Sequence, residues 1–185
     1  MASNTDTGDF VRMCLFAALI AALGLLPKFD LPFLAGVPVT AQTLGVMLAG
    51  VVLGARNGAL AVSLLIFIVA LGMPLLAGGR GGLGIFFGPS GGFLLGWIPG
   101  AWLAGFAMSR FPVGSVPLRA FTASIAGGIC AVYALGIPWL AFVAGLSLPA
   151  AALVAVVFVP GDVIKAIIVA VLVSALPVSQ LQAGR

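Results

Sequence analysis

The sequence predicts an all-α integral membrane protein, and three observations support this fold class. Of its 185 residues, 63% are hydrophobic and only 6% are charged, and the mean hydropathy is +1.32. Apolar runs of helix length recur along the chain, whereas the alternation of apolar and polar residues that is typical of transmembrane β-strands is absent. Because so much apolar surface requires contact with lipid, we expect one transmembrane domain and no soluble domain.

The apolar runs between turn signals predict six transmembrane helices. We expect them at residues 10–26, 39–54, 58–71, 92–109, 119–135 and 150–176. The third run is short for a bilayer unless it extends to about residue 76, and residues 137–145 are too few to span one alone, so we expect a loop or an interfacial segment there. These boundaries divide the chain into a polar N-terminal tail at 1–9, a transmembrane domain at 10–176 and a C-terminal tail at 177–185.

The first apolar run also has the composition of a signal peptide. However, Asp6 and Asp9 precede it instead of basic residues, and the run is longer than the usual apolar region of a signal peptide. We therefore expect residues 10–26 to be retained as the first helix.

The distribution of basic residues predicts how the helices are oriented. If the N-terminus is cytoplasmic, the outer loops hold only Lys28 and Arg80, while the inner ends and loops hold Arg12, Arg56, Arg110, Arg119 and Arg185. The positive-inside rule therefore predicts that both termini are cytoplasmic. The longer connections then lie outside, where irregular backbone can line a site that opens outward; they are residues 27–38, 73–91 and 136–149.

Several classes of site are excluded by composition. The chain has no histidine and no glutamate, and Cys14 lies far from Cys130, which excludes ordinary zinc-ligand spacing and a disulfide framework. The net charge is +4, but the basic residues are scattered singly, so we expect no nucleic-acid partner. Residues 79–84 match the pattern G-x-G-x-x-G without the strand and acidic residue of a dinucleotide site, and no P-loop motif occurs. Any energy from nucleotide hydrolysis must therefore come from another polypeptide.

Asp162 and Lys165 are the strongest candidates for a functional centre. They lie three residues apart, which places them on one face of the last predicted helix. A charged residue in the middle of a membrane costs about 3 kcal/mol or more, so it survives mainly where it meets a partner, a ligand or a cavity. The pair either neutralises itself within a packed bundle or binds a polar ligand, and we favour ligand binding. Pro160 and Gly161 predict a kink beside the carboxylate.

A glycine-rich segment before the fourth helix carries a second candidate charge, Arg80. Its glycines, including Gly81, can bring backbone N–H groups close to a ligand, and Phe93 is among the apolar residues that could cover it. A guanidinium suits a carboxylate because it donates two parallel hydrogen bonds. The alternative is that Arg80 only meets lipid headgroups.

Small residues at intervals of four predict close helix packing. Gly92, Gly96 and Gly100 form such a stripe on the fourth helix. The first helix carries two alanine pairs with the same spacing, which could face either a neighbour in the bundle or another subunit; these pairs are Ala17–Ala21 and Ala18–Ala22.

Four motifs in order along residues 10–176 resemble the BioY family, the biotin-binding S components of energy-coupling factor (ECF) transporters. They are PVTAQT at 38–43, the glycine-rich run at 78–84, GPSGG at 88–92 and Pro160-x-Asp162-x-x-Lys165. The resemblance implies a six-helix S component in a bacterial cytoplasmic membrane that captures biotin from outside. It also implies a membrane T component and two ATPase subunits as partners, with no catalytic activity and no cofactor.

The resemblance also implies which residues bind the ligand. It assigns substrate binding to Asp162 and Lys165, and it extends this role to Gln42, Thr40 and Arg80. The family often has tyrosine where this chain has Phe93, so a hydroxyl contact made there in relatives is absent while stacking stays possible. The alanine pairs on the first helix resemble the face with which S components meet their T partner.

Two alternative functions stay open on the sequence. The chain could be an S component or a solitary transporter for another small vitamin with a carboxylate. It could also be an intramembrane enzyme with Asp162 as base and Lys165 as nucleophile, although no histidine, glutamate or second nearby aspartate is present to divide the acid and base roles. The sequence leaves open whether the chain acts alone, as a homo-oligomer or only with T and ATPase subunits.

Overall fold

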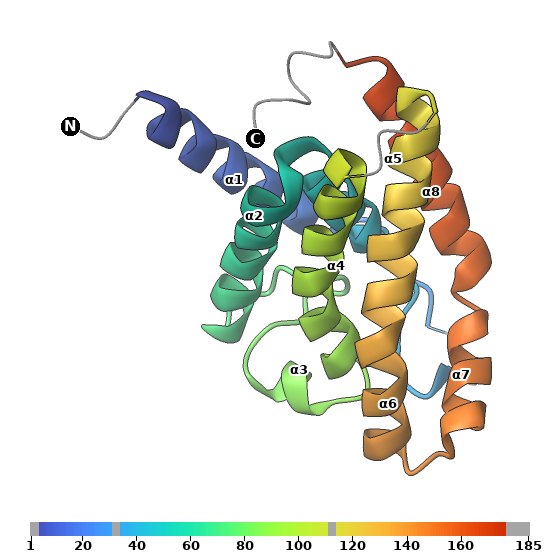
Figure 1. The fold of residues 1–185 in the computed structure, drawn as a ribbon. Helices are drawn as coiled ribbons and strands as arrows, with labels where there is room; N and C mark the ends of the chain where they lie inside the picture. The colour runs from blue at the N-terminus through green and yellow to red at the C-terminus, as the bar shows by residue number, and fades with distance from the viewer. Residues whose placement is uncertain (1–3, 31–33, 111–113, 177–185) are drawn as a thin grey trace.

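The computed structural model describes residues 4–30, 34–110 and 114–176. This part of the chain is helical, with only two isolated β-bridges, between Phe29 and Val39 and between Leu76 and Arg80 (Figure 1). In chain order the elements are α1 (Asn4–Leu23), α2 (Gln42–Ala70), α3 (Gly84–Phe87), α4 (Gly91–Arg110), α5 (Val116–Ser124), the π-helix η2 (Ile125–Ala131), α6 (Val132–Ala144), α7 (Leu148–Val156) and α8 (Val159–Ser174).

Three of the described helical segments are long and apolar enough to cross a membrane, by length and composition alone. They are Gln42–Ala70, Gly91–Arg110 and Val116–Ala144, and the bent pair α7–α8 adds a fourth if it is one crossing. The all-α membrane class is therefore confirmed. Six membrane crossings stay a prediction.

The segment assigned to α2 reverses direction at Gly54. This residue has φ 82° and ψ 176°, a conformation that favours glycine. A straight helix of 29 residues is about 43 Å long, yet Gln42 Nε2 donates to Leu75 O at 3.1 Å, so the two ends of α2 lie at the same end of the molecule. The segment thus contains two helices that fold back on each other, as the separate expected helices at 39–54 and 58–71 require.

Close packing between glycine and backbone holds the centre of the bundle together. A Cβ atom added to Gly50 would collide with Ala101 of α4, and one added to Gly100 of α4 would come within 2.9 Å of Gly127 O in η2. The predicted stripe on α4 therefore faces its neighbours, and α4 lies between α2 on one side and α5, η2 and α6 on the other (Figure 1).

The prediction of a loop or an interfacial segment at residues 137–145 is wrong, and the expected outer connection at 136–149 shortens to the residues between α6 and α7. Residues up to Ala144 belong to α6, which continues α5 and η2 into one helical segment. Pro138 lies inside this helix, and the helix ends only at Gly145, whose φ of 66° is left-handed. The stretch was too short to span a membrane alone because it is the end of the preceding span. α1 also begins at Asn4, so residues 4–9 of the expected tail are helical, whereas the expected tail at 177–185 lies outside the described residues.

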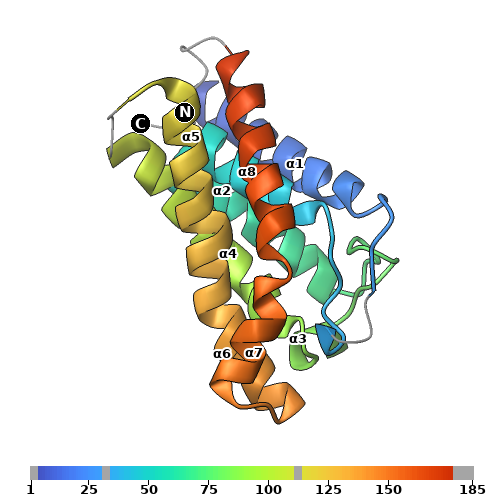
Figure 2. The ribbon, with the colours of Figure 1, turned by 90° about the vertical axis from the view of Figure 1, so that its right-hand side faces the viewer.

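The last span is bent, as the sequence predicted beside Asp162. α7 and α8 meet at an angle of 50° across Val157 and Phe158 (Figure 2). Pro160 lies in the first turn of α8, where its missing N–H costs no intrahelical hydrogen bond. Asp162 lies in the same turn, where the helix dipole favours a negative charge. The break therefore creates a helix N-terminus inside the bundle for the carboxylate.

Candidate functional site

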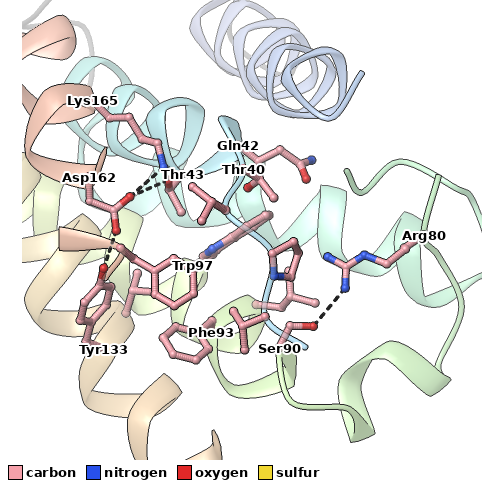
Figure 3. A pocket seen from close by; sticks show the side chains of 16 residues that line it. Thr40, Gln42, Thr43, Arg80, Ser90, Phe93, Trp97, Tyr133, Asp162 and Lys165 are labelled. Carbon is pink, nitrogen blue, oxygen red and sulfur yellow. Dashed lines mark hydrogen bonds and ion pairs between the residues drawn. The ribbon is translucent and has the colours of Figure 1, made fainter. Parts of the chain in front are cut away.

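A pocket opens between the connection that precedes α2, the glycine-rich segment and helices α2, α4, α6 and α8 (Figure 3). Its empty volume is about 570 Å³, which includes space open to solvent at the mouth. The residues that line it are Val37, Pro38, Val39, Thr40, Gln42, Thr43, Arg80, Ser90, Phe93, Leu94, Trp97, Val132, Tyr133, Phe158, Asp162 and Lys165.

Asp162 and Lys165 form an ion pair at one end of this pocket. Lys165 Nζ lies 2.8 Å from Asp162 Oδ1, and the two side chains are only 14% and 5% exposed for Lys165 and Asp162. Both contact Thr43: Lys165 Nζ donates to Thr43 Oγ1 at 2.8 Å, and this hydroxyl donates to Asp162 Oδ1 at 3.2 Å. The hydrogen bonds offset part of the cost of removing the charges from water.

Tyr133 of α6 completes the surroundings of the carboxylate. Its hydroxyl donates to Asp162 Oδ2 at 2.6 Å, which is short, as expected for a donor to an ionised acceptor. The ring of Tyr133 meets Phe93 edge to face, with 5.9 Å between the ring centroids. Side chains from α2, α6 and α8 therefore converge on Asp162 (Figure 3).

Arg80 and Ser90 lie on the opposite side of the pocket from the ion pair (Figure 3). Arg80 Nη1 donates to Ser90 Oγ at 3.4 Å, and Nε donates to Ala77 O at 3.2 Å. Burial lowers the pKa of the Arg80 guanidinium from its ordinary value, and the Asp30 carboxylate opposes this shift. Arginine titrates far above neutral pH, so Arg80 brings a positive charge to this end of the pocket.

Aromatic and aliphatic side chains form the wall between the two polar ends. Phe93, Trp97 and Phe158 are all buried, and Phe93 lies 6.3 Å from Phe158 between ring centroids. The pocket can therefore hold a ligand with an apolar body, one end that pairs with a donor and an acceptor, and another end that is anionic.

Most predicted site residues line this pocket, but they differ in what they offer a ligand. Thr40, Gln42 and Phe93 all line it, but the amide of Gln42 is engaged with backbone groups at Ile20, Leu75 and Ala77. Gly81 is not among the lining residues that the structure describes, and a Cβ there would collide with Met73 O. Its lack of a side chain serves the packing of the glycine-rich segment.

Four lining residues with chemical roles did not emerge as site residues from sequence reasoning: Thr43, Ser90, Trp97 and Tyr133. Tyr133 is the only tyrosine of the chain, and a single aromatic hydroxyl in an apolar span was a signal that could have identified it. Thr43 and Ser90 lie within motifs that carried the family resemblance. Trp97 gave no signal beyond an ordinary apolar residue.

The alanines of α1 divide between two faces of the helix. Ala17 is buried and Ala21 half-buried against the bundle core. Ala18 and Ala22 are exposed. Within the described part of the chain, only the second pair is open to another subunit.

Comparison with known proteins agrees with this architecture. Residues 1–180 match the model of the BioY family. The biotin transporter BioY of Rhizobium etli is 52% identical over 172 residues, which cover 90% of this chain and 91% of that protein, and the biotin transporter BioY of Rhodobacter capsulatus is 52% identical over 163 residues, which cover 83% and 85%.

A solved structure has the same fold. The crystal structure of the S component for biotin from an ECF-type ABC transporter superimposes with a TM-score of 0.87 at 31% identity, and the match covers 94% of this chain and 92% of that one. This likeness confirms the S-component fold. On the family model, the relatives and the shared fold together, the chain belongs to the BioY family.

Proposed function

We propose that this chain takes up biotin across the cell membrane as the substrate-binding component of an ECF-type transporter. It acts in transport and not in catalysis, in keeping with the relatives that are named biotin transporters. The observation that carries the proposal is the Asp162–Lys165 pair, which faces an apolar pocket with Arg80 on the far side.

The ion pair fits the ureido ring of biotin. Two N–H groups of Lys165 are used by Asp162 and Thr43, and an ammonium has three, so one remains to donate to the ureido oxygen. Asp162 can accept the adjacent ureido N–H. A neighbouring donor and acceptor thus meet one edge of a cyclic urea, while Phe93, Trp97 and Phe158 cover its apolar rings.

Arg80 fits the carboxylate of the ligand. The guanidinium can turn from Ser90, whose hydrogen bond at 3.4 Å is long, to a carboxylate that offers a stronger, charge-assisted acceptor. Thr40 and Phe93 line the space between the two ends. We therefore place the ureido ring at Asp162 and the carboxylate tail at Arg80.

We further propose the arrangement in the membrane and the partners. Both termini lie in the cytoplasm, and residues 10–176 form one domain, with Arg80 in an outer connection that lets biotin enter from outside. A T component and two ATPase subunits supply the coupling to ATP hydrolysis, and α1 presents Ala18 and Ala22 to the T component. The related S component comes from an ECF-type ABC transporter.

The test is the substitution Asp162→Asn. It removes the acceptor charge and leaves Lys165 without its counter-ion in a largely dry site, which typically costs about 2 kcal/mol or more. We expect the biotin affinity, measured by isothermal titration in detergent, to fall by at least about 30-fold. Asp30→Asn is the matched control because Asp30 pairs with Lys28 at the surface. Biotin affinity within threefold of wild type for a folded Asp162→Asn protein would contradict the proposed site.

A further inference from the structure

Tyr133 determines how many acceptor positions Asp162 offers to a ligand. A carboxylate has about four lone-pair sites. Oδ1 accepts from Lys165 and from Thr43, and Oδ2 accepts from the Tyr133 hydroxyl. Among the described residues these three are its side-chain partners, so one acceptor direction on Oδ2 remains.

The single open acceptor on Asp162 Oδ2 limits which ligand edges can pair with this carboxylate. We propose that Tyr133 is a positioning residue that sets ligand selectivity by filling one site of Oδ2, and this inference rests on the proposed function. One open acceptor on Asp162 beside one free N–H of Lys165 matches a ligand edge with one N–H next to one carbonyl oxygen. A cyclic urea has such an edge. A cyclic guanidinium presents only N–H groups at the same edge. One of these N–H groups would face the ammonium of Lys165, which is also a donor, so no hydrogen bond can form between them.

The π-helix before α6 aims Tyr133 at Asp162. η2 ends at Ala131, two residues before Tyr133. A π-helical turn adds a residue to the helix, and one residue rotates all later side chains by about 100°. In an uninterrupted α-helix, position 133 would face elsewhere. Such segments are rare and often lie at functional sites.

The geometry also holds the ring in place without the hydroxyl. Phe93 contacts the Tyr133 ring edge to face, and both Phe93 and the neighbouring residue Val132 are buried in the pocket wall. Tyr133→Phe therefore keeps the ring packing and removes only the donor to Oδ2. The loss frees a second acceptor direction on Asp162 and releases the carboxylate from its orientation.

The experiment compares two ligands on the purified full chain in detergent. One is biotin, and the other is its cyclic guanidine analogue, 2-iminobiotin, both measured by competition against radiolabelled biotin. For Tyr133→Phe we expect biotin affinity to fall about tenfold, as for the loss of a hydrogen bond to a charged group. We expect the affinity for the guanidine analogue to hold or rise, because the freed lone pair suits a second N–H. The ratio of the affinity for biotin to the affinity for 2-iminobiotin should therefore be lower in Tyr133→Phe than in wild type by about tenfold or more.

Two controls separate this role from ordinary packing. Trp139→Phe also removes an aromatic donor, but from Gly88 O outside the pocket lining, so it should leave the ratio of the two affinities unchanged. In the Asp162→Asn background, Tyr133→Phe should change biotin affinity by less than about twofold, since the two groups act as one unit.

Three results would overturn the inference: biotin affinity of Tyr133→Phe within twofold of wild type, an equal loss for both ligands, or an undiminished loss in the Asp162→Asn background. Absence of biotin binding to the wild-type chain refutes the proposed function itself, whereas an Asp162→Asn protein that binds biotin normally refutes the proposed site. An Asp162→Asn protein that binds poorly, beside a Tyr133→Phe protein that binds normally, refutes only the role of Tyr133.

Discussion

At the scale of single residues, Gln42 holds three separate segments together. Its side chain is 1% exposed. Nε2 donates to Ile20 O in α1 and to Leu75 O after α2, both at 3.1 Å, and Oε1 accepts from Ala77 N at 2.9 Å. Both amide N–H groups are therefore engaged with backbone, and Gln42, which also lines the pocket, stabilises its wall. A ligand contact at Gln42 stays a prediction.

Replacing Gln42 should lower stability because its partners are buried backbone groups. Gln42→Met keeps the volume of the side chain but leaves two carbonyls and the N–H of Ala77 without this partner. Each unsatisfied buried group costs about 1–3 kcal/mol, and three groups lose their partner, so we expect a loss of at least about 3 kcal/mol and a melting temperature lower by about 6–12 °C in detergent.

The control for Gln42→Met is Ser63→Ala. The Ser63 hydroxyl donates only to Ala59 O of its own helix, so its removal should change the melting temperature by less than about 2 °C. Equal melting temperatures for Gln42→Met and wild type would show that water or a rearranged backbone replaces the amide.

At the scale of helices, sequence patterns predicted correctly those features that depend only on neighbouring residues in the chain. The three-residue spacing of Asp162 and Lys165 puts them on one helix face in any context, and the apolar runs identified the spans. The prediction of a loop at 137–145 was wrong because α5, η2 and α6 form one helical segment that continues through Pro138. Apolar composition alone does not distinguish the end of such a segment from a separate one.

The candidate site was predictable only in part for a related reason. The charges stood out against an apolar background, so Asp162, Lys165 and Arg80 were found. Tyr133 was missed because its direction depends on the register of the π-helix η2, which packs against α4 and which the apolar pattern of the sequence did not predict. Gly81 was expected at the ligand because glycine permits close approach, but here the close neighbour is the backbone of Met73.

The glycine-rich segment between α2 and α3 carries a prediction about the tail of the ligand. Arg80 lies in a tight turn closed by the bridge between Leu76 and Arg80, so the backbone from which its side chain extends is held in place. We expect Arg80→Gln to weaken biotin binding about tenfold, the value of a charge-assisted hydrogen bond. Binding of biotin amide, which has no charged tail, should change by less than about threefold.

Lys28→Gln is the matched control for Arg80→Gln, because Lys28 is a cation of the outer connections that pairs with Asp30 and does not line the pocket. Titration of both ligands against both variants measures the difference. An equal loss of biotin and biotin amide affinity in Arg80→Gln would mean that Arg80 only shapes the segment.

At the scale of the whole molecule, α1 connects the pocket end of the bundle with a free surface. Gln42 binds Ile20 O on the inner side of α1. On the outer side, Ala18 and Ala22 are exposed and lie four residues apart, beside the larger exposed residues Leu15 and Leu19. Small residues with this spacing allow another helix to approach closely, whereas Ala17 is already packed in the core.

The two faces of α1 should respond differently to a bulky residue. Ala18→Trp or Ala22→Trp places an indole on the open face, where it blocks close approach of a T component but lies away from the pocket. We expect biotin binding to the isolated chain to stay within about twofold of wild type. Uptake by cells that also express the T and ATPase subunits should fall at least about tenfold.

Ala17→Trp should instead disturb the core, as overpacking does, and should lower stability, binding and uptake together. Binding and uptake are measured in parallel on variants that insert at wild-type levels. Wild-type uptake by both the Ala18→Trp and Ala22→Trp proteins would assign this face to lipid, and the T component would then have to dock elsewhere on the molecule.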